Sequence, residues 1–97
     1  KEGFKGKNLL HLAAENMSNV DLIKFLANFI ESEIGIEKLR KMMCEYNNEG
    51  FTPLQSAFLY NKTHVGIVEE FMSLYEEHFS FDQLQKILCV KKIIHIH

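Results

Sequence analysis

The sequence predicts an all-α protein built from two similar units, and three observations support this prediction. The 97 residues include one proline and five glycines, too few for a β-meander or long flexible linkers. Hydrophobic residues recur three and four positions apart, as on one face of a helix. Related segments also recur at an interval of 44 to 45 residues, as Gly6 and Gly50 or Val20 and Val65 show. We therefore expect a helical solenoid of two elongated three-helix units joined by a hairpin turn.

Each unit should contain a short helix, a longer helix and a third helix. The expected pairs of ranges are Leu9–Met17 and Pro53–Asn61, Val20–Glu31 and Val65–Glu77, and Ile36–Glu45 and Phe81–Val90. We interpret residues 1–97 as one domain, with a first unit at 3–46, a second at 47–91 and the start of a third at 92–97. The last segment either begins a third hairpin or is a terminal addition.

Three of these helices have recognisable start signals. Thr52 precedes a proline, which gives an N-cap acceptor followed by a residue with a helical φ. Ser80 and Gln83 have the spacing of a capping box, and Ser18 with Asp21 has a similar pattern. We expect Ser18 to cap the second helix and Ser80 to cap the last one.

Composition and charge exclude several classes of function. The formal net charge is −2, which lacks the strongly basic character of a general nucleic-acid binder. Apolar runs are only a few residues long, so we expect no membrane span. No signal-peptide pattern opens the chain, although a start at Lys1 suggests a piece of something longer. We expect a cytoplasmic protein, or one in a host cytoplasm if it is a secreted effector.

Two segments resemble the signature of a known repeat family. Residues 50–57 read Gly-Phe-Thr-Pro-Leu-Gln-Ser-Ala, and residues 10–14 read Leu-His-Leu-Ala-Ala. Together they resemble the glycine turn and T-P-L-H-x-A helix start of ankyrin repeats. Asn8-Leu9 stands where Thr-Pro is expected, and Gln55 replaces the usual histidine. The third helix makes each unit about 12 residues longer than the usual repeat of about 33. The resemblance implies elongated ankyrin repeats, each with an extra outer helix.

The same resemblance implies a protein–protein interaction module without catalytic activity. Partner-facing positions would lie at the hairpin tips and along the exposed side of each first helix. These positions are Phe4, Lys5, Lys7, Glu15, Asn16, Asn48, Glu49, Phe51, Leu59 and Tyr60. Phe51, Leu59 and Tyr60 are unusually apolar for a face that should meet water, and they either anchor a partner or pack against further chain.

Titratable and metal-binding residues have structural interpretations. His11 resembles the ankyrin histidine that bonds the backbone of the neighbouring hairpin, and Gln55 offers similar hydrogen bonds. Cys44 and Cys89 fall at equivalent positions about 8–10 Å apart in stacked helices, too far for a disulfide. Both should be half-buried apolar residues. The histidines at 95 and 97 lack zinc-site spacing, so we expect no metal. The sequence has no glycine-flanked serine, phosphate-binding glycine loop or His-Glu-x-x-His motif, so we expect no cofactor and no enzyme.

Two alternatives to a binding module remain open. The chain could be a structural spacer within a longer repeat array, or a small metal-binding helical protein. Residues 63–83 hold five acidic residues and neither lysine nor arginine, which is either a solvated face or an edge that attracts a basic partner. Two units alone leave apolar ends, which predicts flanking repeats or end-to-end self-association.

Overall fold

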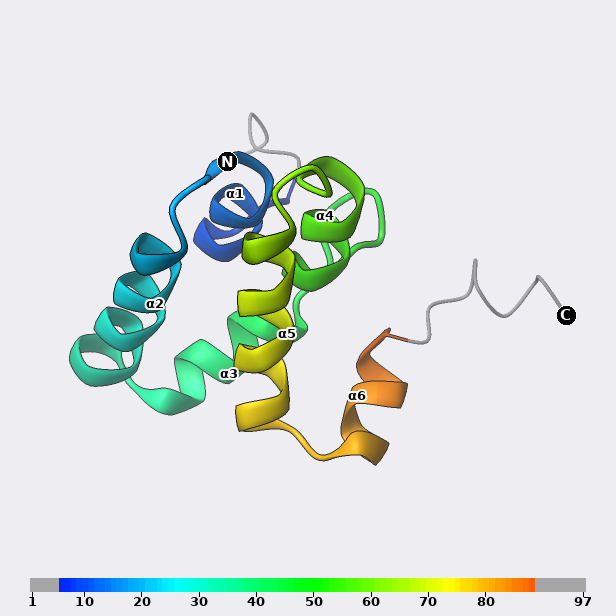
Figure 1. The fold of residues 1–97 in the computed structure, drawn as a ribbon. Helices are drawn as coiled ribbons and strands as arrows, with labels where there is room; N and C mark the ends of the chain where they lie inside the picture. Colours follow the sequence, from blue (N-terminus) through cyan, green and yellow to red (C-terminus); the bar gives the residue numbers. More distant parts are fainter. Residues whose placement is uncertain (1–5, 89–97) are drawn as a thin grey trace, which may run out of the picture.

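The computed structural model describes residues 6–88, and within them the chain is helical with no strand (Figure 1). The elements are α1 (Leu9–Asn16), α2 (Val20–Phe29), a π-helical turn η2 (Ile30–Ile34), α3 (Ile36–Cys44), α4 (Pro53–Tyr60), α5 (Val65–His78) and α6 (Phe81–Leu88). The all-α prediction is confirmed, and each α-helix of this region begins at the residue that the sequence predicts. None of its helices has the length and apolar character needed to cross a membrane.

Side-chain caps explain most of these helix starts. Thr52 Oγ1 accepts a hydrogen bond from the Gln55 backbone N–H at 3.4 Å, and Ser80 Oγ accepts one from the Gln83 N–H at 3.2 Å. The prediction that Ser18 caps α2 is wrong. Asn19 is the residue directly before the helix, and its Oδ1 accepts a hydrogen bond from the backbone N–H two residues later at 2.9 Å.

The second helix of the first unit ends earlier than predicted. Beyond Phe29 the backbone widens into the π-helical turn, and the Gly35 N–H donates to the Ile30 carbonyl oxygen at 2.8 Å. Gly35 has a φ of +134°, a conformation almost confined to glycine. The chain therefore changes direction at Gly35, between the π-helical turn and the start of α3.

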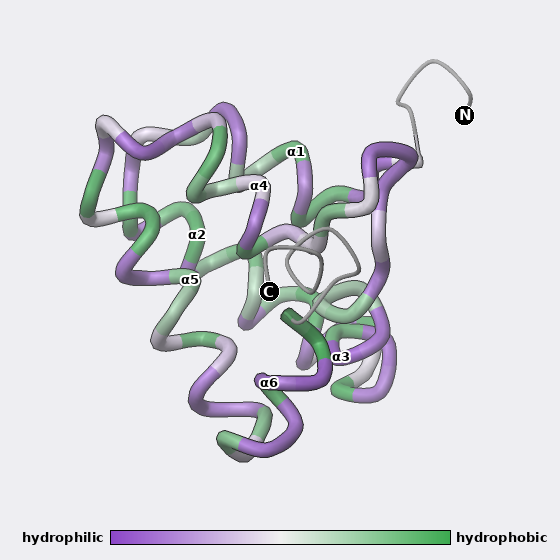
Figure 2. Tube along the Cα trace, turned by 90° about the vertical axis from the view of Figure 1, so that its right-hand side faces the viewer, coloured by the Kyte–Doolittle hydropathy of each residue, from purple (hydrophilic) through white to green (hydrophobic). Residues whose placement is uncertain are grey.

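The two units lie side by side. α1 packs against α4, and α2 packs against α5 (Figures 1 and 2). Leu10 and Leu54, which the repeat places at equivalent positions, are both buried in the shared core. Figure 2 shows apolar stretches of both units alternating with polar ones along the helices.

Hydrogen bonds connect the two units at several points. The Asn61 Nδ2 group donates to the carbonyl oxygens of Ala14 at 2.9 Å and Met17 at 2.7 Å, at the end of α1. The buried Tyr75 hydroxyl donates to the Met43 carbonyl oxygen at 2.7 Å. Buried polar groups need such partners, so these bonds fix how the units are placed relative to one another.

The third helices differ in their surroundings. Leu39, Met42 and Met43 of α3 are buried, whereas none of the residues of α6 is. Leu84, the counterpart of Leu39, packs against the core but is only partly buried. The repeat interval of 45 residues makes Leu39 and Leu84 equivalent and predicts like surroundings, but their burial differs, because the second unit covers α3 whereas no described helix covers α6 in the same way.

The prediction that both cysteines are half-buried and unpaired can be compared with the structure only at Cys44. Cys44 is a free, half-buried cysteine at the end of α3, and burial raises the pKa of its thiol. The predicted partner residues Phe4 and Lys5, the second cysteine at 89, and the segment 92–97 lie outside the described residues.

Candidate functional site

The site begins with four predicted partner-facing side chains that the fold brings together. Lys7 Nζ lies 2.8 Å from Glu15 Oε1 and 6.0 Å from the centre of the Tyr60 ring. The Tyr60 hydroxyl donates to Glu49 Oε1 at 3.0 Å. These four residues, which we call the hairpin cluster, come from the segment before α1, the end of α1, the turn before α4 and the end of α4. They meet because α1 packs on α4.

The turn that carries Glu49 is held by an asparagine side chain. Asn47 Oδ1 accepts hydrogen bonds from the Glu49 N–H at 2.9 Å and the Phe51 N–H at 3.0 Å. The Gly50 N–H donates to the Asn47 carbonyl oxygen at 2.9 Å, and Gly50 has a φ of +90°. The turn therefore presents Glu49 towards Tyr60 on a fixed backbone.

Hydrogen bonds within the hairpin cluster hold Lys7 charged and Tyr60 protonated near neutral pH. The hydrogen bond from Lys7 to Glu15 raises the pKa of the Lys7 ammonium, so this lysine stays charged. The hydrogen bond to Glu49 raises the pKa of the Tyr60 phenol, so the hydroxyl stays protonated and remains a donor. Lys7 pairs with Glu15, and the Tyr60 hydroxyl bonds Glu49.

One carboxylate of the hairpin cluster is incompletely satisfied. Glu15 Oε1 bonds Lys7, whereas the buried Glu15 Oε2 has no hydrogen-bond partner among the described residues. A buried carboxylate oxygen without a donor is costly, so this atom favours any donor that can reach it.

His11 lies in α1, the helix that also carries Glu15, and it bonds the backbone of the neighbouring hairpin, as the sequence predicts. Its Nε2 atom lies 2.8 Å from the Phe51 carbonyl oxygen, and its Nδ1 accepts from the Asn8 N–H at 3.1 Å. Both contacts are satisfied when the proton is on Nε2. Burial lowers the pKa of His11, which favours this neutral form.

Gln55 accepts the equivalent N-cap hydrogen bond in the second unit, but its donor reaches the end of α6 and not a hairpin. Its Oε1 accepts from the Thr52 N–H at 2.9 Å, and its Nε2 donates to the Leu88 carbonyl oxygen at 3.2 Å. The replacement of histidine by glutamine therefore preserves one acceptor and one donor at the same helical position, as predicted.

The remaining predicted partner residues contribute unequally. Leu59 and Tyr60 are exposed at the end of α4. Phe51 is half-buried, and its carbonyl and N–H groups serve the hairpin through His11 and Asn47. The Asn16 side chain bonds within its own helix, donating to the Leu12 carbonyl oxygen at 2.8 Å. Asn48 is exposed and lies against the Gly6 backbone at the neighbouring turn.

The sequence predicts apolar ends for two units, but the residues that form them were not identified. Leu22, Phe25 and Phe29 are exposed along α2, and the rings of Phe25 and Phe29 stack with centroids 6.2 Å apart. The signal was present in the sequence, since α2 is apolar at more positions than one buried face requires.

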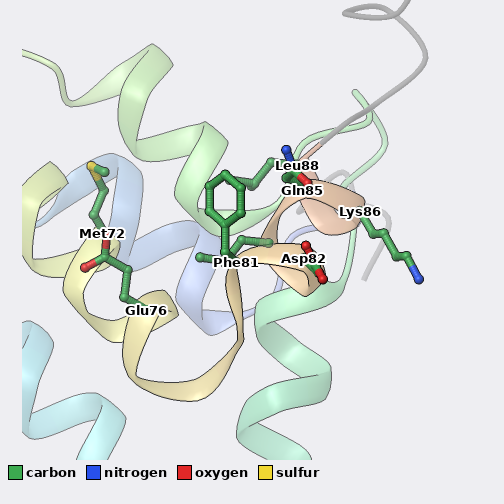
Figure 3. A pocket seen from close by; sticks show the side chains of 8 residues that line it. Met72, Glu76, Phe81, Asp82, Gln85, Lys86 and Leu88 are labelled. Atoms are coloured by element: carbon green, nitrogen blue, oxygen red, sulfur yellow. The ribbon is translucent and has the colours of Figure 1, made fainter.

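A groove lies at the end of the molecule away from α2. It has a volume of about 840 Å³ and lies between α5 and α6 (Figure 3). Met72 and Glu76 line it from α5, and Phe81 and Leu88 line it from α6. The groove has no nucleophile–base pair, and within residues 6–88 no three His, Cys, Asp or Glu side chains gather as a metal site.

In the comparisons with known proteins, no family model, no curated protein and no solved structure matches this chain.

Proposed function

We propose that this chain is a protein–protein interaction module of ankyrin-like repeats, without catalytic activity, whose partner binds at the hairpin cluster and the exposed end of α4. The observation that carries the proposal is the meeting of Lys7, Glu15, Glu49 and Tyr60, residues that lie up to 53 positions apart in the sequence. Four side chains that the resemblance assigns to a partner surface thus form one contact network.

The chemistry of this surface suits a polypeptide partner. Leu59 and Tyr60 offer exposed apolar area beside the charged cluster, and tyrosine is enriched among the residues that dominate interface energies. Among the described residues, the buried Glu15 Oε2 atom has no hydrogen-bond partner, so a partner that places a donor there is favoured. No covalent chemistry is needed for this role.

The packing of the helices supports the repeat architecture within the proposal. α1 lies against α4 and α2 against α5, so corresponding helices of the two units are neighbours. His11 and Gln55 also accept corresponding hydrogen bonds from the backbone N–H of the N-cap residues Asn8 and Thr52. A cytoplasmic location is part of the same proposal.

An affinity capture experiment with matched variants tests this proposal. The chain is immobilised and exposed to cell lysate, and the retained proteins are compared with those retained by a variant carrying Leu59→Ser and Tyr60→Ala. Val65→Ser serves as the control because Val65 is equally exposed but lies at the start of α5. We expect retained proteins to be lost with the double variant and kept with the control.

Unchanged retention by the double variant would favour the alternative function, a structural spacer. If the double variant retains every protein that the wild-type chain retains, the end of α4 is not a recognition surface. The chain is then a structural spacer of a repeat array.

A further inference from the structure

Two apolar surfaces lie at opposite ends of the molecule, one on each unit. The first, which we call the head, consists of Leu9, Leu22, Phe29 and Ile34, all exposed on the first unit. The second, which we call the tail, consists of Phe58, Met72, Leu84 and Leu88 on the second unit. Met72, Leu84 and Leu88 line the groove between α5 and α6 (Figure 3).

The counterparts of the head residues in the second unit are covered. At the repeat interval, Leu22 corresponds to Ile67, and their exposed fractions are 49% and 1%. The other three counterparts are Pro53, Leu74 and Phe79; the first two are buried and the third packs against the core. α4 and α5 pack on α1 and α2, so the first unit covers these positions of the second unit.

The tail residues show the reverse relationship. Phe58 is 48% exposed, whereas its counterpart Ala14 in the first unit is 0% exposed. The counterparts of the other tail residues are Ala27, Leu39 and Met43, and all three are buried. The helices that carry these counterparts pack against the second unit. Asn61 and Tyr75 of the second unit also donate hydrogen bonds to the Ala14 and Met43 carbonyls.

We propose that the head of one copy of this chain packs on the tail of a second copy. The internal contact between the two units already joins these two kinds of surface, so the exposed head and tail are the two halves of one interface. Phe58 and Met72 are larger than the alanines at the equivalent internal positions, which gives the tail more apolar area to bury. The contact joins unlike surfaces, so it leaves a free head and a free tail and can extend into a chain of copies.

A pair of blocked variants tests this arrangement. Leu22→Asp with Phe29→Asp blocks the head, and Met72→Asp with Leu84→Asp blocks the tail. Sedimentation velocity measures the mass of each protein over a range of concentrations. We expect the wild-type mass to rise with concentration, each blocked variant to remain monomeric, and an equimolar mixture of the two to form a dimer. The mixture retains one open head and one open tail, which permit a single contact.

Each other outcome overturns the proposal. A wild-type chain that stays monomeric at the highest concentration that remains in solution shows that head and tail do not meet. A tail-blocked variant that dimerises alone shows a head-to-head contact instead. A mixture that stays monomeric while both variants keep the wild-type circular dichroism excludes the head-to-tail pair.

A further variant separates this inference from the proposed function. Leu59→Ser with Tyr60→Ala alters the partner surface but neither the head nor the tail. We expect this variant to self-associate like the wild-type chain, whatever it retains from a lysate. If it becomes monomeric, the self-contact uses the end of α4 and the head-to-tail arrangement is wrong.

Discussion

α3 and α6 have the same sequence pattern but different surroundings. Both are short helices with an acidic residue in the first turn and a lysine in the last turn. α3 buries three apolar side chains, whereas α6 buries none, although Gln55 and Tyr46 donate hydrogen bonds to its last residues. The comparison shows that an amphipathic period determines which face of a helix is apolar, whereas a neighbouring unit determines whether that face is buried.

The largest expected effect comes from truncating the two equivalent leucines. Leu39→Ala removes a fully buried side chain and should lower the free energy of unfolding by about 2–5 kcal/mol. Leu84→Ala should cost less than about 1.5 kcal/mol, because Leu84 remains partly exposed. Urea unfolding monitored by circular dichroism measures both. Equal losses would mean that α6 is as well covered as α3.

Removing the Tyr75 hydroxyl tests the contact between the units. Tyr75→Phe deletes the donor to the Met43 carbonyl and the acceptor for the Leu54 N–H, which should cost about 1–3 kcal/mol. Tyr46→Phe is the matched control, since the exposed Tyr46 hydroxyl bonds the Ile87 carbonyl and should contribute little. Thermal or urea unfolding compares the two variants. A Tyr75→Phe protein as stable as the control would contradict a role for this bond in joining the units.

Replacing Gly35 by serine, the residue at the corresponding position of the second unit, tests why the two units differ before their third helices. Gly35 has a φ of +134°, whereas the corresponding residue, Ser80, caps α6. Gly35→Ser should cost about 1 kcal/mol or somewhat more, because a side chain at this φ is strained even though the space around it is open. The midpoint of urea unfolding measures the change. An unchanged midpoint would show that the backbone turns into α3 without needing glycine.

The smallest effect concerns the pH dependence that His11 adds to the first unit. The folded protein lowers the pKa of His11, so the unfolded chain binds its proton at a higher pH than the folded chain does. The stability from neutral His11 is therefore fully present above pH ~6.5 and declines as the pH falls below it. His11→Gln should reduce this slope by at most about 1.4 kcal/mol per pH unit.

Urea unfolding from pH 7.5 to pH 5 checks this prediction, with His64→Gln as a matched control on the exposed surface. Glutamine at position 11 can keep the donor and the acceptor that Gln55 supplies in the second unit. Identical slopes for the wild-type and His11→Gln proteins would exclude His11 as the source of the pH dependence.

Local chemistry explains how far the fold could be predicted. Thr52 and Ser80 are followed by Gln55 and Gln83, so their helix starts follow from residues within one turn. Ser18 was wrongly assigned because Asn19, equally able to cap, directly precedes the helix. The widened turn after Phe29 could not be predicted, since the period of α2 continues through it.

The candidate site was predictable in part because hairpin residues follow the repeat. Lys7, Glu15, Glu49 and Tyr60 were identified from their positions in the two units, but their mutual contacts depend on α1 lying on α4. The exposed Phe58 was missed. It lies four residues after the buried Leu54, on a face whose equivalent in the first unit is covered. Exposure at such a position depends on whether another segment packs against it, and the sequence of one unit does not encode that neighbour.

The Asn61 side chain has a consequence for how the molecule assembles. It donates to two carbonyl oxygens at the end of α1, although it belongs to the residue that ends α4. The Ala14 and Met17 carbonyls thus acquire these donors only after a segment at least 44 positions downstream has folded beside them. We therefore expect the two halves of the chain to unfold together, with amide protons in α1 and α4 that exchange through openings of a common free energy.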